Sequence, residues 1–503
     1  MRNICGALCL AVLLSGALEA GEVSRELQRR IADRETRAKL IKSLPDSIRK
    51  GQSAFLTAQA AICQWLITHQ AKTDAAVVMT EIELIDDKHA SLAGLKKSID
   101  AITSDTPLDE TKKKDLAARR KSAQKVRATG FFELAKTYFS SGLPRHAFDL
   151  VQQALELDPD LAPARQALGQ VKGPDGWTDA FSAAQASKGH VYVPERGWVP
   201  AQAAERIKKG EWFENGRWMS IDDADKAHAE MSAAWTVETQ HFIIKSNAPR
   251  HKVIALAERL EAFRQVCYRE CVEFFQRGER KPQISFTHAP KAKLLVHYMA
   301  QRKDYEAAIK NEFKGPLKAF IPFLMLFPGF YTPTSHASYF DMGDENPIQQ
   351  FFVLHEVGRQ MLGEFAQVGV QNTRPWINEG IAGVVTFARP DQNGKWYIPT
   401  GRSHDAVTKA AELLVNGGMV PLSVLVNMEE AQFNKEPGAE ARRTESAAFA
   451  RYLIDAKDGI YATDFMELVY DTLKGVKTAT FADYLGDAAE FEKGFVDFLQ
   501  GGK

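Results

Sequence analysis

The sequence predicts an α+β protein with a helical N-terminal region, a small tryptophan-rich connector and a mixed C-terminal domain. Three observations lead to this prediction. Residues 21–125 are rich in Ala, Leu, Lys, Glu and Gln, and their apolar residues recur at helical spacing. Residues 173–235 hold five of the eight tryptophans. From residue 235 onward, strand-like alternation and amphipathic helical patterns succeed one another.

The size and charge of the chain limit the possible classes of protein. A chain of 503 residues is too long to fold around a single hydrophobic core, so two to four domains are expected. Hydrophobic residues make up 45% and charged residues 25%, which is typical of globular proteins. Lys plus Arg and Asp plus Glu number 64 each, and this balance argues against a nucleic-acid partner.

The first twenty residues have the pattern of a secretory signal peptide. Arg2 supplies the positive start, residues 4–14 form a short apolar run, and small residues follow at a candidate cleavage site. A buried N-terminal helix is the alternative. No later segment holds eighteen uninterrupted apolar residues, so no transmembrane helix is expected. The predicted location is therefore secreted or periplasmic.

Three cysteines remain outside the predicted signal, namely Cys63, Cys267 and Cys271. Their number is odd, and they have neither the spacing of a zinc ribbon nor that of a disulfide framework. We expect all three to be buried free thiols.

The predicted helical region covers residues 21–170, and its clearest pattern lies between residues 131 and 159. Small and large apolar residues there are similar in spacing to a tetratricopeptide repeat. They are Leu134, Ala135, Tyr138, Ala147, Val151 and Ala154, followed by Pro159. A generic helical hairpin is the alternative. Tetratricopeptide repeats stack and present a concave face to protein partners, so this region is a candidate protein-binding surface.

The connector, residues 171–234, is predicted to contain two strand-turn-helix units. Each unit has a Trp-containing strand that leads into a short helical run, over residues 202–208 and 222–230. The tryptophans could form an aromatic ligand surface. We favour the alternative that they are the core of a small domain with few other apolar residues to bury.

The C-terminal domain, residues 235–503, combines predicted strands with amphipathic helices. The strands are expected at residues 236–245, 284–286 and 294–298. The helices are expected at residues 251–275, 351–365, 403–415, 445–456, 463–474 and 490–499.

A zinc-peptidase motif with one ligand missing lies on the predicted helix 351–365. In H-E-x-x-H, two histidines one turn apart bind zinc and the Glu is the general base. Residues 355–359 read H-E-V-G-R, so Arg359 stands at the second His position. The segment W-I-N-E-G-I-A follows at residues 376–382 and contains Glu379.

These motifs together resemble the gluzincin metallopeptidases, of the thermolysin and aminopeptidase type. The likeness is greatest to a peptidase-like domain of secreted bacterial proteins that often carry tetratricopeptide repeats upstream. The resemblance implies a gluzincin-like fold for residues 235–503, with His355 as first zinc ligand, Glu356 as general base and Glu379 as third ligand. The second ligand does not carry over, and the tyrosine that the family often has near residues 442–446 is missing.

Arg359 decides what such a site could still do. A guanidinium has no available lone pair and stays protonated, so Arg359 cannot bind zinc. We expect it to replace the metal cation by pairing with Glu379 and Glu356. The alternatives are that Arg359 points to solvent, or that His297, His336 or His404 supplies the missing ligand.

The sequence therefore predicts a secreted metallopeptidase homologue with an impaired zinc site, a pseudoenzyme that binds a protein or peptide. The helical repeat region and the site cleft are the candidate binding surfaces, and the expected cofactor is none or weakly bound zinc. The alternatives are an active zinc-dependent peptidase with a non-standard ligand, and a structural envelope protein.

Overall fold

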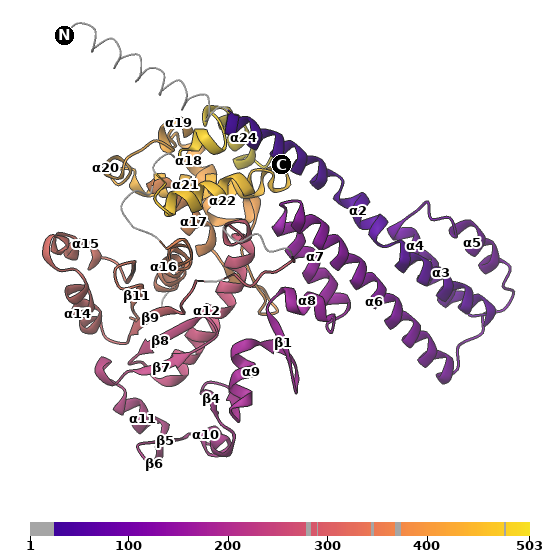
Figure 1. The fold of residues 1–503 in the computed structure, drawn as a ribbon, viewed down its shortest axis with the longest axis horizontal. Coiled ribbons are helices and arrows are strands. Elements are labelled where there is room, and N and C mark those ends of the chain that lie inside the picture. The colour runs from indigo at the N-terminus through magenta and orange to yellow at the C-terminus, as the bar shows by residue number, and fades with distance from the viewer. Residues whose placement is uncertain are drawn as a thin grey trace, which may run out of the picture. The chain divides into compact units, whose positions relative to one another are not determined.

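The computed structural model describes residues 25–277, 283–288, 290–343, 347–367, 374–476 and 479–502 (Figure 1). The predicted signal peptide, residues 1–20, lies outside these ranges. The described chain is α+β, as the sequence predicts. It divides into two compact units. We call residues 36–177 with 283–287 the helical unit, and residues 25–35, 178–277, 288 and 290–502 the mixed unit. None of the described helices is long and apolar enough to cross a membrane.

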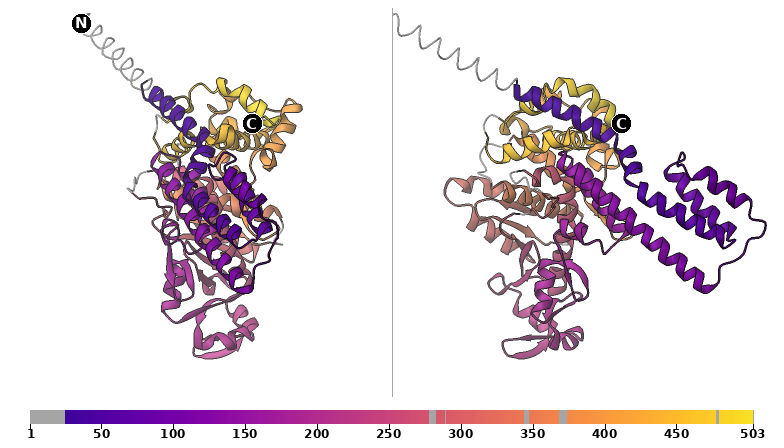
Figure 2. Two further views of the ribbon diagram at one scale, coloured as in Figure 1. Left: turned by 90° about the vertical axis from the view of Figure 1, so that its right-hand side faces the viewer. Right: turned by 45° about the vertical axis from the view of Figure 1, so that its right-hand side comes forward.

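The helical unit consists of helices from α2 to α8. Their bounds are Leu44–Gly51, Ser53–Thr68, Lys72–Ile85, Leu92–Asp100, Glu110–Ser140, Pro144–Leu157 and Ala162–Ala167. Asp109 caps α6 by accepting a hydrogen bond from the backbone of Lys112. Figure 2 shows α6 and α7 side by side. Ala135, Ala147 and Val151 are buried in the helical unit, where small side chains permit close packing. The predicted helical pair is confirmed, and its assignment as a tetratricopeptide repeat stays a prediction.

Residues 284–286, predicted as a strand, form none. The backbone amide of Phe286 donates to the carbonyl of Ala167 at 2.7 Å, beyond the end of α8. The Phe286 ring packs edge-on against Phe139 and Phe148. Apolar packing onto helices therefore accounts for this short apolar run.

Three β-hairpins, each followed by a short helix, replace the two units predicted for the connector. The strand pairs are β1–β2 (Gln170–Gly173, Gly176–Asp179), β3–β4 (His190–Val193, Gly197–Pro200) and β5–β6 (Glu211–Glu214, Arg217–Ser220). The helices α9, α10 and α11 span Ala180–Ser187, Ala204–Lys208 and Ile221–Ala227. Asn215 and Gly216 both have positive φ angles, as a two-residue hairpin turn requires. The first hairpin was missed because its strand 170–173 is short and largely polar.

Several connector tryptophans serve as core, as favoured from the sequence. Trp212 and Trp218 pack against a small cluster that includes Val193, Val199 and Ile207. Trp235 is buried. The guanidinium of Arg206 also lies 4.0 Å from the centre of the Trp218 ring.

The mixed unit contains a five-stranded sheet in the order β10-β11-β9-β8-β7. The strands β7 to β11 span Trp235–Glu238, Phe242–Ser246, Leu294–Met299, Gly329–Thr332 and Ala337–Asp341. Strand β9 pairs in parallel with β8 and β11, and the two outer pairs are antiparallel. The single strand predicted over residues 236–245 is therefore wrong. It is a hairpin, because Glu261 accepts hydrogen bonds from Thr239 and the backbone of His241 and holds the chain in a turn.

Helices cover both faces of this sheet. Tyr339 of β11 packs with Tyr305 and Ile309 of α14 (Arg302–Glu312) on one face. The next residue back, Ser338, donates to Gln360 of α16 (Pro347–Ala366) at 2.9 Å. Successive residues of a strand point to opposite faces, so α14 and α16 lie on opposite sides. Helix α12 (Arg250–Glu270) packs against both β8 and α16.

A helical layer completes the mixed unit. Its longer helices are α17 (Pro375–Thr386), α18 (Asp405–Val415), α21 (Ala439–Gly459), α22 (Ala462–Leu473) and α24 (Ala489–Leu499). These confirm the four helices predicted after residue 400. The short elements are α13 (Val272–Phe275), α15 (Ile321–Leu324), α19 (Leu422–Leu425), α20 (Glu430–Phe433), α23 (Phe481–Tyr484), β12 (Arg389–Pro390) and β13 (Trp396–Tyr397). Trp376 is buried between Phe449, Phe465 and Phe481. Cys63, Cys267 and Cys271 are buried free thiols, as expected.

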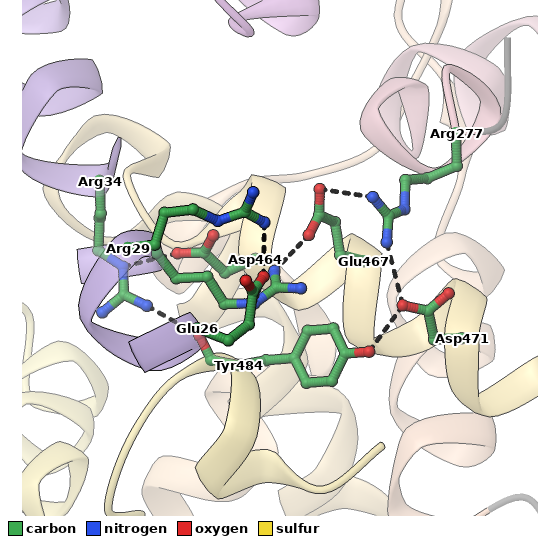
Figure 3. A network of polar contacts seen from close by, with 9 residues as sticks. Glu26, Arg29, Arg34, Arg277, Asp464, Glu467, Asp471 and Tyr484 are labelled. Atoms are coloured by element: carbon green, nitrogen blue, oxygen red, sulfur yellow. Dashed lines mark hydrogen bonds and ion pairs between the residues drawn. The ribbon is translucent and has the colours of Figure 1, made fainter. Parts of the chain in front are cut away.

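Residues 25–42 form a helix whose first part belongs to the mixed unit. Figure 3 shows a polar network that joins this part to α22 and α23. Arg34 Nε donates to Asp464 at 2.7 Å, and Arg34 also donates to the carbonyl of Tyr484. Glu467 is shared by Arg30 and Arg277.

Candidate functional site

Two adjacent helices, α16 and α17, carry all four residues singled out from the sequence. Helix α16 holds His355, Glu356 and Arg359, and α17 holds Glu379. Glycines permit the close approach of the helices here. A Cβ atom on Gly358 would lie 2.7 Å from the side chain of Val385 in α17. A Cβ atom on Gly380 would lie 2.9 Å from the carbonyl oxygen of Ser446 in α21.

The structure brings His355, Glu356 and Glu379 together. Nε2 of His355 lies 3.8 Å from Oε1 of Glu356 and 3.9 Å from Oε2 of Glu379. Glu356 is buried, whereas the side chain of Glu379 is 23% exposed, so a molecule from solvent can reach Glu379 more easily. The spacing of the two motifs thus corresponds to a real convergence of one imidazole and two carboxylates.

Thr386 fixes the orientation and the tautomer of His355. The Thr386 hydroxyl donates its hydrogen to the carbonyl of Ala382 at 2.6 Å, so it can only accept from His355. Nδ1 of His355 lies 3.1 Å from this hydroxyl and is therefore the protonated nitrogen of the neutral ring. The lone pair on Nε2 then faces the two carboxylates.

The carboxylate of Glu356 is already engaged on two sides. Oε2 accepts a hydrogen bond from the backbone amide of Tyr331 in β10 at 2.9 Å. Nη1 of Arg359 lies 3.4 Å from both carboxylate oxygens. A general base needs a free lone pair directed at its water, and these two donors compete for the lone pairs of Glu356.

Arg359 pairs with Glu356, and Glu379 has a different cationic neighbour. The Glu356 carboxylate, and to a smaller extent Glu379, raises the pKa of Arg359, so the guanidinium stays charged. Nε of Arg443, on α21, lies 3.8 Å from Oε2 of Glu379. The side chain of Arg359 is 37% exposed, so it reaches solvent while it contacts Glu356. The expected contact with Glu356 is present, but the ion-pair partner of Glu379 is Arg443 instead of Arg359.

These residues do not fit a catalytic zinc ion. Such sites use three protein ligands and a water molecule. Arg359 occupies the second ligand position with a group that has no lone pair and carries a positive charge. Among the residues that the structure describes, no cluster of three or more His, Cys, Asp and Glu side chains has the arrangement of a metal site.

The three histidines considered as replacement ligands are engaged elsewhere. The ring of His297 stacks on Tyr339, and His336 contacts Glu364 at 2.9 Å. His404 is buried and caps α18, with Nε2 3.0 Å from the carbonyl oxygen of Val384. Burial lowers the pKa of both His297 and His404 to about 4. These contacts direct all three side chains to other partners.

Sequence reasoning missed three contributors to this site. Thr386 lies seven residues after Glu379 on the same face of α17, so helical spacing could have identified it. Arg443 and Tyr331 lie far away in sequence and carry no comparable signal. The hydroxyl of Tyr331 donates to Glu364 at 2.7 Å, and burial with this hydrogen bond raises its pKa.

The chain was also compared with known proteins. No protein-family model matches the sequence, and no curated protein matches it. The resemblance to gluzincins therefore remains a prediction based on the H-E-V-G-R and W-I-N-E-G-I-A segments.

Proposed function

We propose that this protein is an exported metallopeptidase homologue that has lost its zinc chemistry and binds a protein or peptide at the former site. The observation that carries this proposal is the contact of Arg359 with Glu356. It sets a permanent cation against the residue that would otherwise be the general base. The remaining histidine and carboxylate groups are retained around it.

The exposed parts of the site suit a polar peptide. Arg359, Glu379 and Arg443 are each between one fifth and two fifths exposed, and they present two positive charges and one negative charge at the helix surface. Arginine binds carboxylates in a planar, two-point geometry. A peptide with an acidic side chain or a free C-terminus is therefore the kind of ligand that this surface favours. The helical unit is a second candidate surface, through α6 and α7.

Zinc titration of the wild type and Arg359→His tests the loss of metal chemistry. We expect substoichiometric zinc and no peptide hydrolysis for the wild type. Arg359→His restores a nitrogen ligand one turn from His355, so its zinc affinity should rise. Arg374→His is the matched control, because Arg374 precedes α17 and pairs with Glu429. Calorimetry and elemental analysis provide the measurements.

Two outcomes would contradict the proposal. Tightly held stoichiometric zinc in the wild type, with hydrolysis that Glu356→Gln abolishes, would favour the active-peptidase alternative. A peptide array probed with the wild type and with Arg443→Glu tests binding separately. Identical array profiles, or no bound peptide, would reject the peptide-binding part.

A further inference from the structure

A cavity lies in the mixed unit, apart from the site around His355. It has a volume of about 180 Å³. Its cationic lining residues are Arg264, Lys291 and Lys293, and its apolar walls include Phe275, Leu294 and Met361. Met361 follows Arg359 by two residues on α16 and so lies on nearly the opposite face of that helix. The cavity shares no residue with the site proposed above.

Arg264 is a charged lining residue that forms no ion pair with a described carboxylate. Among the described residues, its guanidinium donates one hydrogen bond, to the carbonyl of His288 at 3.3 Å, and stacks over Tyr268. No described carboxylate lies within ion-pair distance of it. Glu261, one turn earlier on α12, is bonded to Thr239 and His241. Burial lowers the pKa of Arg264, which shows that its charge is poorly solvated.

The other polar residues that line the cavity differ in their ion pairs and hydrogen bonds. Nζ of Lys293 is already paired with Glu238 at 2.7 Å and bonded to the carbonyl of Thr239. Burial lowers the pKa of His241, and Nδ1 of this ring lies 2.7 Å from Glu261. Lys291 is exposed and forms no ion pair with a described residue. Two cations, Arg264 and Lys291, thus line the cavity without an ion pair to a described carboxylate, and none of the described lining residues is a carboxylate.

We propose that this cavity binds a small organic anion, whose carboxylate or phosphate group pairs with Arg264 and Lys291. Its short apolar body lies against Phe275, Leu294 and Met361. Arginine offers several donors in a planar fork, which matches either oxyanion. At roughly 30 Å³ for each water-sized volume, the cavity of about 180 Å³ holds about six non-hydrogen atoms. This is the size of a short-chain fatty acid or a small phosphate ester.

Calorimetry on the full chain with four probes tests this site. The probes are butyrate, hexanoate, inorganic phosphate and butylamine. We expect an anion to bind and butylamine, which has the same apolar body with opposite charge, not to bind. If inorganic phosphate is the only probe that binds, the anionic group of the ligand is a phosphate. Tighter binding of hexanoate than of phosphate would assign a carboxylate with an apolar body.

Two variants test whether the anion binds in this cavity. Arg264→Gln should lower the affinity for the preferred anion by about tenfold or more, because a charge-assisted hydrogen bond is lost. Arg259→Gln makes the same charge change on α12 outside the cavity lining and should leave binding unchanged. If Arg264→Gln fails to fold, Lys291→Gln at the exposed mouth serves instead, with a smaller loss expected. The proposal is overturned if no anion binds the wild type, or if the folded Arg264 or Lys291 variant binds as well as the wild type.

Discussion

Arg359 and Glu356 form the ion pair that matters most for the chemistry of the candidate site. The side chain of Glu356 is 8% exposed and that of Arg359 is 37% exposed. Removing Arg359 would leave a buried carboxylate whose one remaining hydrogen-bond donor, among the residues that the structure describes, is the Tyr331 amide. We therefore expect Arg359→Gln to lower the free energy of unfolding by about 1–3 kcal/mol.

A double-mutant cycle measures this pair. Glu356→Gln in the Arg359→Gln background should recover part of the loss, with a coupling energy of about 1–2 kcal/mol in urea unfolding. Arg374→Gln is the control, because its partner Glu429 is largely exposed, and a change below about 0.5 kcal/mol is expected. Additive losses in the cycle would show that the two side chains do not interact in solution.

Glu445 on α21 makes stability depend on pH. Burial, with a smaller contribution from nearby Glu492, raises the pKa of Glu445 from 4.5 to about 8, although the hydrogen bond from the Val420 amide and the charge of Arg442 oppose this shift. One oxygen accepts from the backbone amide of Val420, and the other has no hydrogen-bond partner in the described part of the chain. Between these two pKa values the folded state holds a proton that the unfolded state has lost. The contribution to stability is therefore complete below pH 4.5 and is lost as pH rises toward about 8.

Glu445→Gln should remove this dependence, because the amide cannot ionise. Relative to the wild type, the variant should gain about 3–4 kcal/mol of unfolding free energy between about pH 5 and about pH 8. Glu440→Gln, on the exposed face of the same helix, is the control and should follow the wild-type profile. Parallel pH profiles for wild type and Glu445→Gln in denaturant titrations would contradict the raised pKa.

At the scale of elements, the first part of helix 25–42 is fixed to the mixed unit by ion pairs. Arg34 and Asp464 are both largely buried, and their atoms lie 2.7 Å apart (Figure 3). Arg34→Ala should lower the free energy of unfolding of the mixed unit by about 1–3 kcal/mol, since Asp464 loses a buried cation. Chemical denaturation followed by tryptophan fluorescence measures this loss.

Arg29 offers a matched control on the same helix. Its side chain is 68% exposed, and among the described residues it pairs only with Glu26, three residues away. Arg29→Ala should change the stability by less than about 0.5 kcal/mol. Equal effects of Arg29→Ala and Arg34→Ala would mean that the segment is not held through its contact with Asp464.

At the scale of the whole molecule, each unit has its own hydrophobic core. Leu66 is fully buried in the helical unit, and Leu453 is fully buried in the mixed unit. Separate cores predict more than one unfolding transition. Leu66→Ala should lower the free energy of unfolding of the helical unit by about 2–5 kcal/mol. Leu453→Ala should lower that of the mixed unit by a similar amount. Differential scanning calorimetry distinguishes the two. A single transition that both substitutions shift equally would show one cooperative unit.

The sequence by itself determined the features that depend on local spacing. Helical periodicity placed His355, Glu356 and Arg359 on one helix. The W-I-N-E-G-I-A segment, through its resemblance to gluzincins, implied that Glu379 belongs to the same site. The chemistry of Arg359 followed from its side chain alone, because a guanidinium has no lone pair for a metal. The α+β class and the four late helices also followed from apolar periodicity, which each segment carries within itself.

Tertiary structure alone decided which distant groups meet. The partner of Glu379 is Arg443, because the glycines of α17 let α21 approach closely, and no local pattern specifies that approach. The amide of Tyr331 reaches Glu356 because β10 is paired with β11 and lies beside α16. Residues 236–245 form parts of two strands instead of one, because Glu261, on a later helix, binds the turn between them. Such contacts depend on the packing of whole elements, and short-range periodicity contains no information about it.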